Sequence, residues 1–405
     1  MNEVRRLLPD RHTVSHPASP ERLRERGFDQ ALAKAMAMSS EAIIAEIIAS
    51  GIKGRGGAAF PTGLKWSSVN KAAGQTKYVV MNADESELGT FKDRVLLEED
   101  PLGALVGLLI AAHAVGARKA FCYIRGEYRE VEHRLARALD ILQQEGWGGP
   151  DAVDVEIRRG AGAYIAGEET ALFNSIEGKR PEPRVKPPFP TNKGLWGSPT
   201  LIQNVETLAN VAVLFAHDAA WFTQYGTKDT AGTKLIALSG HIQHPGVYEV
   251  PFGMPLADIL HAPDLGGSLA GSGRLGAVLL GGAAGTFLSP DEVATSRLDY
   301  ASLGAVGASI GSGAVMVFDD TVDLQWVLTK LARFFAEESC GQCVPCRIGT
   351  QRIMEIAEQG NLWTRNQDLR ALSQAMRDAS ICGLGQTAPL ALLSILDRPG
   401  LRRDA

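Results

Sequence analysis

The five cysteines of this 405-residue chain are unevenly distributed, and four of them lie near its C-terminal end. Cys340, Cys343 and Cys346 form a C-x2-C-x2-C run within ESCGQCVPCRIG, and Cys382 follows in a later segment. Three cysteines at this spacing can direct their thiolates toward one inorganic core, and Cys382 can supply a fourth ligand. The run therefore predicts a metal centre that the C-terminal part of the chain must fold around.

Two kinds of centre fit four thiolates. Zinc is bound tetrahedrally by four cysteines, but such sites usually draw their ligands in two pairs. Three cysteines in a run with one distant cysteine are more typical of a 4Fe–4S cluster. The spacing favours the cluster, and a zinc site remains the alternative.

Cys122 lies in the apolar segment FCYI, and we expect it to be a small buried hydrophobe.

Composition and charge exclude several classes of protein. The net charge of -5 argues against a dominant nucleic-acid footprint. Hydrophobic residues make up 45% of the chain, which is ordinary for a soluble globular protein. The longest apolar stretch, residues 102–115, is too short to cross the ~30 Å hydrocarbon core of a membrane. The N-terminus has no apolar segment typical of a signal peptide. We expect a soluble protein without a membrane span.

The fold class follows from the order of apolar patterns along the chain. Strand-like and helix-like segments alternate in the first half, which predicts an α/β domain with a largely parallel sheet. Residues 181–204 are rich in proline and are expected to form a long loop. The expected helices are 40–50, 102–115, 129–144, 255–261 and much of 322–405, and the expected strands are 78–81, 119–124, 153–157, 235–238, 247–250, 278–280 and 315–318.

Changes in composition divide the chain into four parts. Residues 1–38 are polar and charged and are expected to form a loosely packed arm. Residues 39–226 carry the alternating α/β pattern, residues 227–320 read as a smaller α+β domain, and residues 321–405 are helical and hold the cysteine run.

Two loops carry residues suited to a phosphate-bearing ligand. The segment GIKGRGGAAF resembles a dinucleotide fingerprint, but a helix precedes it where a strand is required. It is either a flexible turn or an anion-binding nest of backbone N–H groups. The acidic segment NADESELGTFKDR follows a strand, where open α/β sheets bind ligands. Its carboxylates can accept hydrogen bonds from ribose hydroxyls, although a solvated turn is the commoner fate of such a run.

A third segment, RGAGAYIAGEETAL, again places small residues between a strand and a helix. Glu168 and Glu169 near the helix start can simply complement the helix dipole, and taken alone the pair favours that interpretation over a functional one. His241 and His244 flank a turn without further ligands, so we expect no metal there.

Six segments in this order carry a family resemblance: GRGGAAFPTGLKW, NADESELGTFKDR, RGAGAYIAGEETAL, KPPFP, NVETLAN and ESCGQCVPCR. Over about residues 40–390 the chain resembles the flavin-bearing NADH dehydrogenase subunit of complex I, a family that includes diaphorase subunits of NAD-linked hydrogenases and formate dehydrogenases. The resemblance implies a Rossmann-like FMN-binding domain, a ubiquitin-like β-grasp domain and a C-terminal helical bundle that carries a 4Fe–4S cluster. It also implies hydride transfer from NADH to FMN, followed by single-electron transfer to the cluster.

The resemblance assigns roles to residues by matching motif positions. NADH stacked over the flavin would contact Phe60, Glu87, Glu169, Lys186 and Phe189, with Glu87 and Glu169 as candidates for a catalytic, positioning role. The cluster ligands would be the four clustered cysteines. FMN would be contacted by Gly54, Arg55, Gly56, Gly57, Lys65, Asn82, Asp84, Glu85, Ser86, Tyr164, Gly167, Glu168, Ile202, Gln203, Asn204 and Thr207.

Four positions depart from the family pattern and bear on affinity. Leu88 replaces a usual proline, Ala166 a common non-ligand cysteine, Gln203 a common asparagine, and Ser68 a position that is often aromatic. Adenine stacking would then rest on Phe60 and Phe189 alone.

The resemblance also implies partners: a thioredoxin-like 2Fe–2S subunit and a larger iron–sulfur subunit of a multi-subunit NADH-quinone oxidoreductase. The location would be cytoplasmic, peripheral on the membrane through those subunits. A hydrogenase or formate dehydrogenase diaphorase is the alternative, favoured by the ending ICGLGQTAP, whereas the short N-terminal arm favours complex I. A zinc-stabilised interaction module and a ligand binder built on the small domain are further alternatives.

Overall fold

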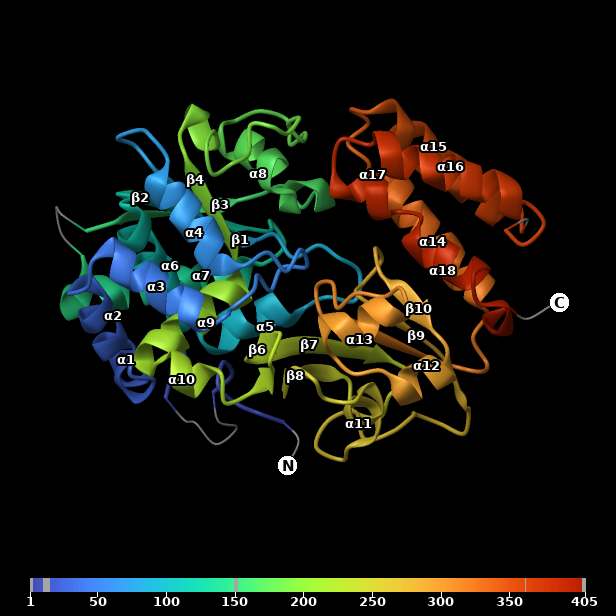
Figure 1. Ribbon diagram of the computed structural model, residues 1–405, viewed down its shortest axis with the longest axis horizontal. Coiled ribbons are helices and arrows are strands. Elements are labelled where there is room, and N and C mark those ends of the chain that lie inside the picture. The colour runs from blue at the N-terminus through green and yellow to red at the C-terminus, as the bar shows by residue number, and fades with distance from the viewer. Residues whose placement is uncertain (1–2, 10–14, 149–151, 361, 403–405) are drawn as a thin grey trace.

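The computed structural model describes residues 3–9, 15–148, 152–360 and 362–402. The chain forms a four-stranded sheet and a five-stranded sheet. Figure 1 shows the two sheets with their helices, and the group of C-terminal helices beside them. The strands are β1 (Tyr78–Ala83), β2 (Lys119–Ile124), β3 (Asp154–Arg159), β4 (Thr200–Asn204), β5 (Gly226–Thr227), β6 (Thr230–Ala231), β7 (Thr233–Gly240), β8 (Gly246–Pro251), β9 (Leu275–Leu280), β10 (Thr286–Leu288) and β11 (Ala314–Asp319).

The helices before the five-stranded sheet are α1 (Pro20–Glu25), α2 (Phe28–Met36), α3 (Ser40–Ala49), α4 (Thr62–Lys71), α5 (Lys92–Glu99), α6 (Pro101–Val115), α7 (Arg129–Leu142), α8 (Glu169–Ile176), α9 (Val205–Ala216) and α10 (Ala219–Phe222). Those that follow are α11 (Leu256–His261), α12 (Pro290–Thr295), α13 (Tyr300–Ala305), α14 (Leu324–Glu338), α15 (Val344–Glu358), α16 (Asn366–Ala379), α17 (Gly383–Thr387) and α18 (Leu390–Leu396). Single turns of other helix types are η1 (Gln143–Trp147), η2 (Tyr164–Gly167), η3 (Leu195–Gly197) and η4 (Pro399–Leu401).

The first sheet is entirely parallel, with the strand order β3-β2-β1-β4. Together with its covering helices it confirms the predicted α/β class. Strand β1 has β2 on one side and β4 on the other, so the order reverses between β1 and β4. Open parallel sheets bind ligands beyond the carboxyl ends of their strands at such a reversal. Asn82 and Asn204 face each other in register there.

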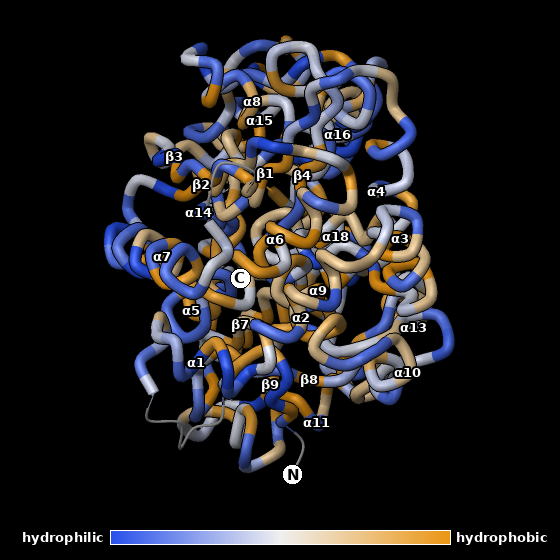
Figure 2. Tube along the Cα trace, turned by 90° about the vertical axis from the view of Figure 1, so that its left-hand side faces the viewer, coloured by the Kyte–Doolittle hydropathy of each residue, from blue (hydrophilic) through white to orange (hydrophobic). Residues whose placement is uncertain are grey.

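Helix α6 forms the centre of the largest apolar core. All of its residues except His113 are buried, which explains an apolar run without a polar face. It packs on α9, and both helices appear among the hydrophobic segments at the centre of Figure 2. This core supports the sheet from the side opposite η2 and α8, which belong to a separate apolar cluster.

The second sheet is mixed and has the order β10-β9-β11-β7-β8. Strands β7 and β8 form an antiparallel hairpin, and β11 returns parallel to β7 at the centre. The four expected strands in this region are present, and the pattern misses the short strand β10. Helix α11 follows the hairpin, as the pattern over residues 255–261 predicts.

The C-terminal helices α14 to α18 share an apolar cluster with residues of η2, α8 and the second sheet. Leu328, Leu331 and Phe335 lie on the buried face of α14, as their spacing predicts. Across the described ranges, every helix is too short or too polar to cross a membrane.

Two expectations about the chain are wrong. The N-terminal segment is not a loosely packed arm within its described residues, because Leu7, Leu8, Leu23 and Phe28 are buried in the main core. Ser19 caps α1 by accepting a hydrogen bond from the Arg22 N–H.

The second error concerns the proline-rich segment 181–204, which its composition predicts to be a loop throughout. Its last five residues form β4, which pairs with β1. Thr200 and Leu201 are fully buried in this strand.

Candidate functional site

A cavity of about 520 Å³ opens at the reversal of the first sheet. Its walls come from the glycine loop, the segment after β1, η2, the start of α9, the second sheet and α17. This volume is within the ~300–1,000 Å³ typical of small-molecule and cofactor sites. The cavity therefore lies where the strand order predicts a ligand.

Eleven of the predicted site residues line this cavity: Gly56, Gly57, Asn82, Asp84, Glu85, Ser86, Glu87, Tyr164, Gly167, Glu168 and Asn204. They come from segments that are far apart in the sequence, so the structure brings together the motifs that were identified separately. The roles of individual residues in binding remain predictions.

The other predicted residues do not line the cavity: Gly54, Arg55, Phe60, Lys65, Glu169, Lys186, Phe189, Ile202, Gln203 and Thr207. Arg55 is buried and donates its guanidinium N–H groups to the carbonyls of Lys53 and Ala231, so its side chain is directed to the protein interior. Its backbone N–H donates to Thr207 Oγ1 at 2.9 Å. Phe60 and Phe189 are more than half exposed, at 53% and 55%.

The glycines of the loop leave space that side chains would fill. A Cβ atom at Gly56 would lie 3.1 Å from Cβ of Asn204, and Gly57 has a φ of +124°, which favours glycine. A Cβ at Gly167 would lie 3.2 Å from the Asp84 carbonyl. Close approach of backbone to backbone around the cavity suits a phosphate-bearing ligand held by N–H groups.

Buried polar atoms without partners indicate that the site fits a further hydrogen-bonding group. Oδ1 of Asp84, on the cavity wall, is buried and has no partner among the described residues. The same holds for Nε2 of Gln203, which does not line the cavity but precedes the lining residue Asn204. Oδ2 of Asp84 accepts a hydrogen bond from Ser86 at 2.8 Å, so the carboxylate is fixed with one oxygen unused. A ligand hydroxyl or N–H group would satisfy it.

Burial of Asp84 has a measurable consequence for stability. Desolvation raises its pKa from 3.8 to about 7. Because the folded state then holds the proton more tightly than the unfolded state, this carboxyl lowers stability as pH rises from about 4 to 7.

We expect Asp84→Asn to stabilise the ligand-free protein at pH 8 by a few kcal/mol and to change its stability little near pH 4. Each tenfold difference in proton affinity between the folded and unfolded states contributes about 1.4 kcal/mol. Thermal unfolding of both proteins at several pH values measures this. An equal difference between variant and wild type at every pH would contradict it.

Glu87 is held between two parts of the molecule. Tyr164 donates its hydroxyl to Oε2 at 2.6 Å, and the backbone N–H of Ala284, just after β9, donates to Oε1 at 3.0 Å. Burial raises the pKa of Glu87 above its usual value, and these hydrogen bonds offset only part of that rise. The carboxylate is thus fixed on the cavity wall by contacts with η2 and with the second sheet.

A second polar group lies at the start of α8. Glu168 caps this helix by accepting hydrogen bonds from Thr170 and Ala171. Lys186 Nζ contacts Glu168 and Glu169 at 2.8 and 2.7 Å, and Lys65 lies 3.6 Å from Glu169. Burial would raise the pKa of Glu169, but the two ammonium groups lower it, so the carboxylate stays ionised. Predicted residues from three segments therefore meet here.

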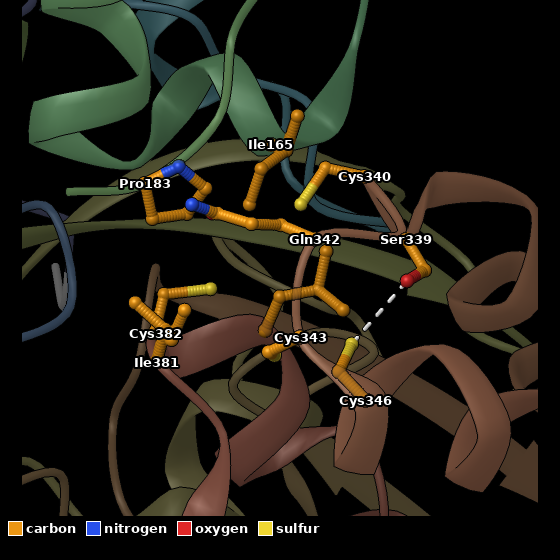
Figure 3. Close-up of a pocket in the computed structure, with 10 residues that line it drawn as sticks. Ile165, Pro183, Ser339, Cys340, Gln342, Cys343, Cys346, Ile381 and Cys382 are labelled. Carbon is orange, nitrogen blue, oxygen red and sulfur yellow. Dashed lines mark hydrogen bonds between the residues drawn. The ribbon is translucent and has the colours of Figure 1, made fainter. Parts of the chain in front are cut away.

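The four clustered cysteines line a separate, smaller cavity. Figure 3 shows Cys340 and Cys382, from two segments, with their sulfur atoms directed toward the space between them. Cys346 Sγ lies 3.4 Å from Ser339 Oγ, and the backbone N–H groups of Leu384 and Gly385 donate to Cys382. Hydrogen bonds of this kind tune the potential of an iron–sulfur cluster.

The four thiols are a soft donor set that suits an iron–sulfur cluster or zinc. Burial raises the pKa of Cys346 and of Cys382 to about 11, so these groups are thiols until a metal displaces their protons. Within the described ranges, no three His, Cys, Asp or Glu side chains gather to hold a single metal ion. Cys122 is fully buried in β2, as expected.

The two cavities share a wall. Ile165 of η2 and Leu384 of α17 line both of them. Cys382 directly precedes α17, and Tyr164 precedes Ile165, so residues of the two sites are neighbours along the chain as well.

The motifs did not reveal several residues of the larger cavity. Lys92 and Asp93 on α5 line it, as do Gly281, Ser312 and Leu384. Lys92 and Asp93 belong to the segment NADESELGTFKDR and were available as a signal, whereas the others come from distant parts of the chain.

Comparison with known proteins agrees with both sites. Residues 47–213 match the family model described as the Nuo51 FMN-binding domain. Residues 326–398 match the NADH-ubiquinone oxidoreductase-F iron-sulfur binding region, and this match decides for iron–sulfur over zinc.

Among its relatives, the chain is 41% identical over 402 residues to the F 2 subunit of the NADH-quinone oxidoreductase of Rhizobium meliloti (strain 1021), covering 96% of this chain and 93% of that one. It is 39% identical to the HndC subunit of the NADP-reducing hydrogenase of Solidesulfovibrio fructosivorans, covering 92% and 77%. A crystal structure of an NAD+-reducing [NiFe]-hydrogenase in the H2-reduced state matches with a TM-score of 0.84 and 38% identity, over 92% of this chain and 64% of that chain. The chain therefore spans less than two thirds of that hydrogenase chain. With this extent of likeness, the chain belongs to the family of NADH-quinone oxidoreductase F subunits.

Proposed function

We propose that this chain is the electron-input subunit of a multi-subunit oxidoreductase, which takes a hydride from NADH on FMN and passes electrons singly to a 4Fe–4S cluster. The observation that carries the proposal is the common wall of the two cavities. Because Ile165 and Leu384 line both, a flavin in one and a cluster in the other would be separated by a thin layer of side chains.

FMN supplies the chemistry, since a flavin accepts two electrons as hydride and can release them one at a time. The protein contributes binding and orientation. Asn82, Asp84 and Ser86 would accept or donate hydrogen bonds to the flavin, and Gly56 and Gly57 would admit its phosphate to the loop. Hydride transfer needs positioning rather than a strong acid or base, so no proton donor is assigned.

The nicotinamide nucleotide would occupy the outer side of the cavity. Phe60 and Phe189 are half-exposed aromatic rings suited to stacking, and Glu169 is an ionised carboxylate on a neighbouring motif. A carboxylate repels a 2′-phosphate and accepts from ribose hydroxyls, which favours NADH over NADPH. Glu87 and Glu169 act in this proposal as positioning groups.

The finer architecture is part of the proposal. A β7–β8 hairpin, the following helix α11 and the parallel return of β11 support a ubiquitin-like β-grasp unit within residues 227–320. The packing of α14 on α15, with α16 and α17 beside them, supports a helical cluster-bearing unit within residues 321–405.

The partners would be a thioredoxin-like 2Fe–2S subunit and a larger iron–sulfur subunit, with the assembly peripheral on the cytoplasmic face of the membrane. A second candidate is a diaphorase subunit that reduces NAD+ or NADP+ with electrons from a hydrogenase. The hydrogenase relatives, at 38 to 40% identity, support it about as well as the F subunits do. Identification of co-purifying subunits separates the two candidates.

The proposal is tested by NADH:ferricyanide reductase activity of anaerobically purified protein, with FMN and iron quantified on the same sample. We expect activity with about one FMN and about four iron atoms per chain, as one cubane requires. Bound zinc, no flavin and no activity after reconstitution with FMN would contradict it.

A further inference from the structure

A cluster of buried charges extends from the wall of the larger cavity into the protein interior, and the mechanism above assigns no role to it. Its members are fully or almost fully buried and come from five segments: Arg55, Glu85, Lys92, Asp93, Glu206 and Lys234. Three are basic and three are acidic. Lys234 is the member that belongs to the second sheet, on β7.

Four of these charges form a continuous chain of ion pairs. Lys234 Nζ lies 2.5 Å from Glu206 Oε2, which is also 2.9 Å from Lys92 Nζ. Lys92 in turn lies 2.6 Å from Asp93 Oδ1. Glu206 also accepts the backbone N–H of Leu235 at 2.8 Å, so its two oxygens hold β7 and α5 together.

The chain of contacts ends on Asn204, a predicted flavin contact. Asp93 Oδ2 accepts a hydrogen bond from Asn204 Nδ2 at 2.6 Å, and Asn204 Oδ1 accepts from the Glu206 N–H at 3.0 Å. The amide is thus held at both ends, with its orientation determined by the charged groups. Asn204, Lys92 and Asp93 all line the cavity.

Net stability does not explain such a cluster, because desolvation of buried charges offsets most of their attraction. Burial lowers the pKa of Lys234, although Glu206 opposes this, so the charge of Lys234 depends on its carboxylate partner. What the arrangement provides is fixed geometry, since Glu206 and Lys92 each form ion pairs with two other members. Fixed geometry is what a cofactor site requires of its supporting residues.

We propose that Lys234 is a positioning residue for the flavin, acting through Glu206, Lys92 and Asp93 to orient the amide of Asn204. Through Lys234, the second sheet thereby contributes to flavin binding indirectly, without contacting the flavin. This inference rests on the proposed function, because it requires FMN in the larger cavity.

The test is FMN affinity of flavin-free protein, measured by quenching of flavin fluorescence, for wild type, Lys234→Met, Asn204→Ala and the double variant. We expect Lys234→Met to weaken FMN binding at least tenfold relative to wild type. In the Asn204→Ala background, the same substitution should weaken FMN binding by less than a further twofold. The flavin midpoint potential of the saturated variant should also shift. Lys119→Met removes a lysine from the exposed pairs with Asp154 and Glu156 and should bind FMN as wild type does.

A purely structural role for Lys234 would lower the melting temperature of the flavin-free protein and leave affinity and potential unchanged, which would overturn the inference. Independent, multiplying effects of Lys234→Met and Asn204→Ala would also overturn it. If Lys234→Met does not fold, Asp93→Asn interrupts the same chain, and wild-type affinity in that variant is the contrary result. Wild-type protein that binds no FMN would overturn the proposed function, and this inference with it.

Discussion

Replacing Cys382 with serine is expected to abolish the 4Fe–4S cluster while FMN binding is retained. Cys382 is the predicted ligand that comes from outside the C-x2-C-x2-C run. Without it, the three cysteines of the run leave one corner of a cubane without a thiolate. Iron and sulfide content, with the visible spectrum of anaerobically purified protein, measure the loss. FMN should remain, because the flavin cavity is built mainly from the first sheet and its loops.

The matched control is Cys122→Ala. Cys122 is also buried, but it lies in β2 and contributes to the main core rather than to the cysteine cavity. We expect this variant to keep about four iron atoms per chain. Full iron content in Cys382→Ser, or an equal loss in both variants, would show that the assignment of the ligands is wrong.

Gly107→Ala should produce the largest loss of stability among conservative substitutions in the core. Helix α6 passes so close to α9 that a Cβ at Gly107 would lie 1.9 Å from the Leu208 carbonyl oxygen. Both helices are buried, so the clash has to be relieved by moving backbone. Overpacking typically costs about 1–3 kcal/mol, and a clash with backbone should place this variant near the upper end. The Tm should fall by roughly 5–10 °C for a domain of this size.

Gly304→Ala is the comparison for this variant. Gly304 also lies within a helix, α13, but a Cβ there would meet nothing within 4 Å. Alanine is the better helix former by about 1 kcal/mol, so Tm should stay level or rise. Thermal unfolding followed by circular dichroism compares the two, and a Gly107→Ala protein as stable as Gly304→Ala would refute the close contact.

The sequence was sufficient where a pattern is local. Short apolar runs predicted β1 and β2, and the alternation of Val153, Val155 and Ile157 predicted β3. The apolar run at residues 102–115 predicted α6, because burial on all sides leaves no polar face. The cysteine spacing predicted a shared cavity, because ligands of one centre must be close in space.

Long-range contacts explain what the sequence did not reveal. Phe28, Ala31, Leu32 and Ala35 have helical spacing, but charged neighbours obscured the face that they bury against α6 and α9. Residues 200–204 form strand β4 because they pair with β1. The prolines that precede them led to the prediction of a loop.

The buried charges illustrate the same limit at the site. Lys92, Glu206 and Lys234 are ordinary charged residues in the sequence, and only the packing of α5, α9 and β7 around one point joins them. Conversely, motif matching grouped Arg55 with the cofactor contacts, whereas its guanidinium is occupied by carbonyls of the interior.

The central claim is that NADH reduces the cluster through the flavin within this one chain. It is tested most directly by adding NADH anaerobically to protein loaded with FMN and iron, and by following flavin absorbance and the electron paramagnetic resonance signal. The account predicts that the flavin bleaches and that the signal of the reduced cluster appears. The contrary result is a flavin that bleaches with NADH while the cluster stays oxidised, although dithionite reduces that same cluster.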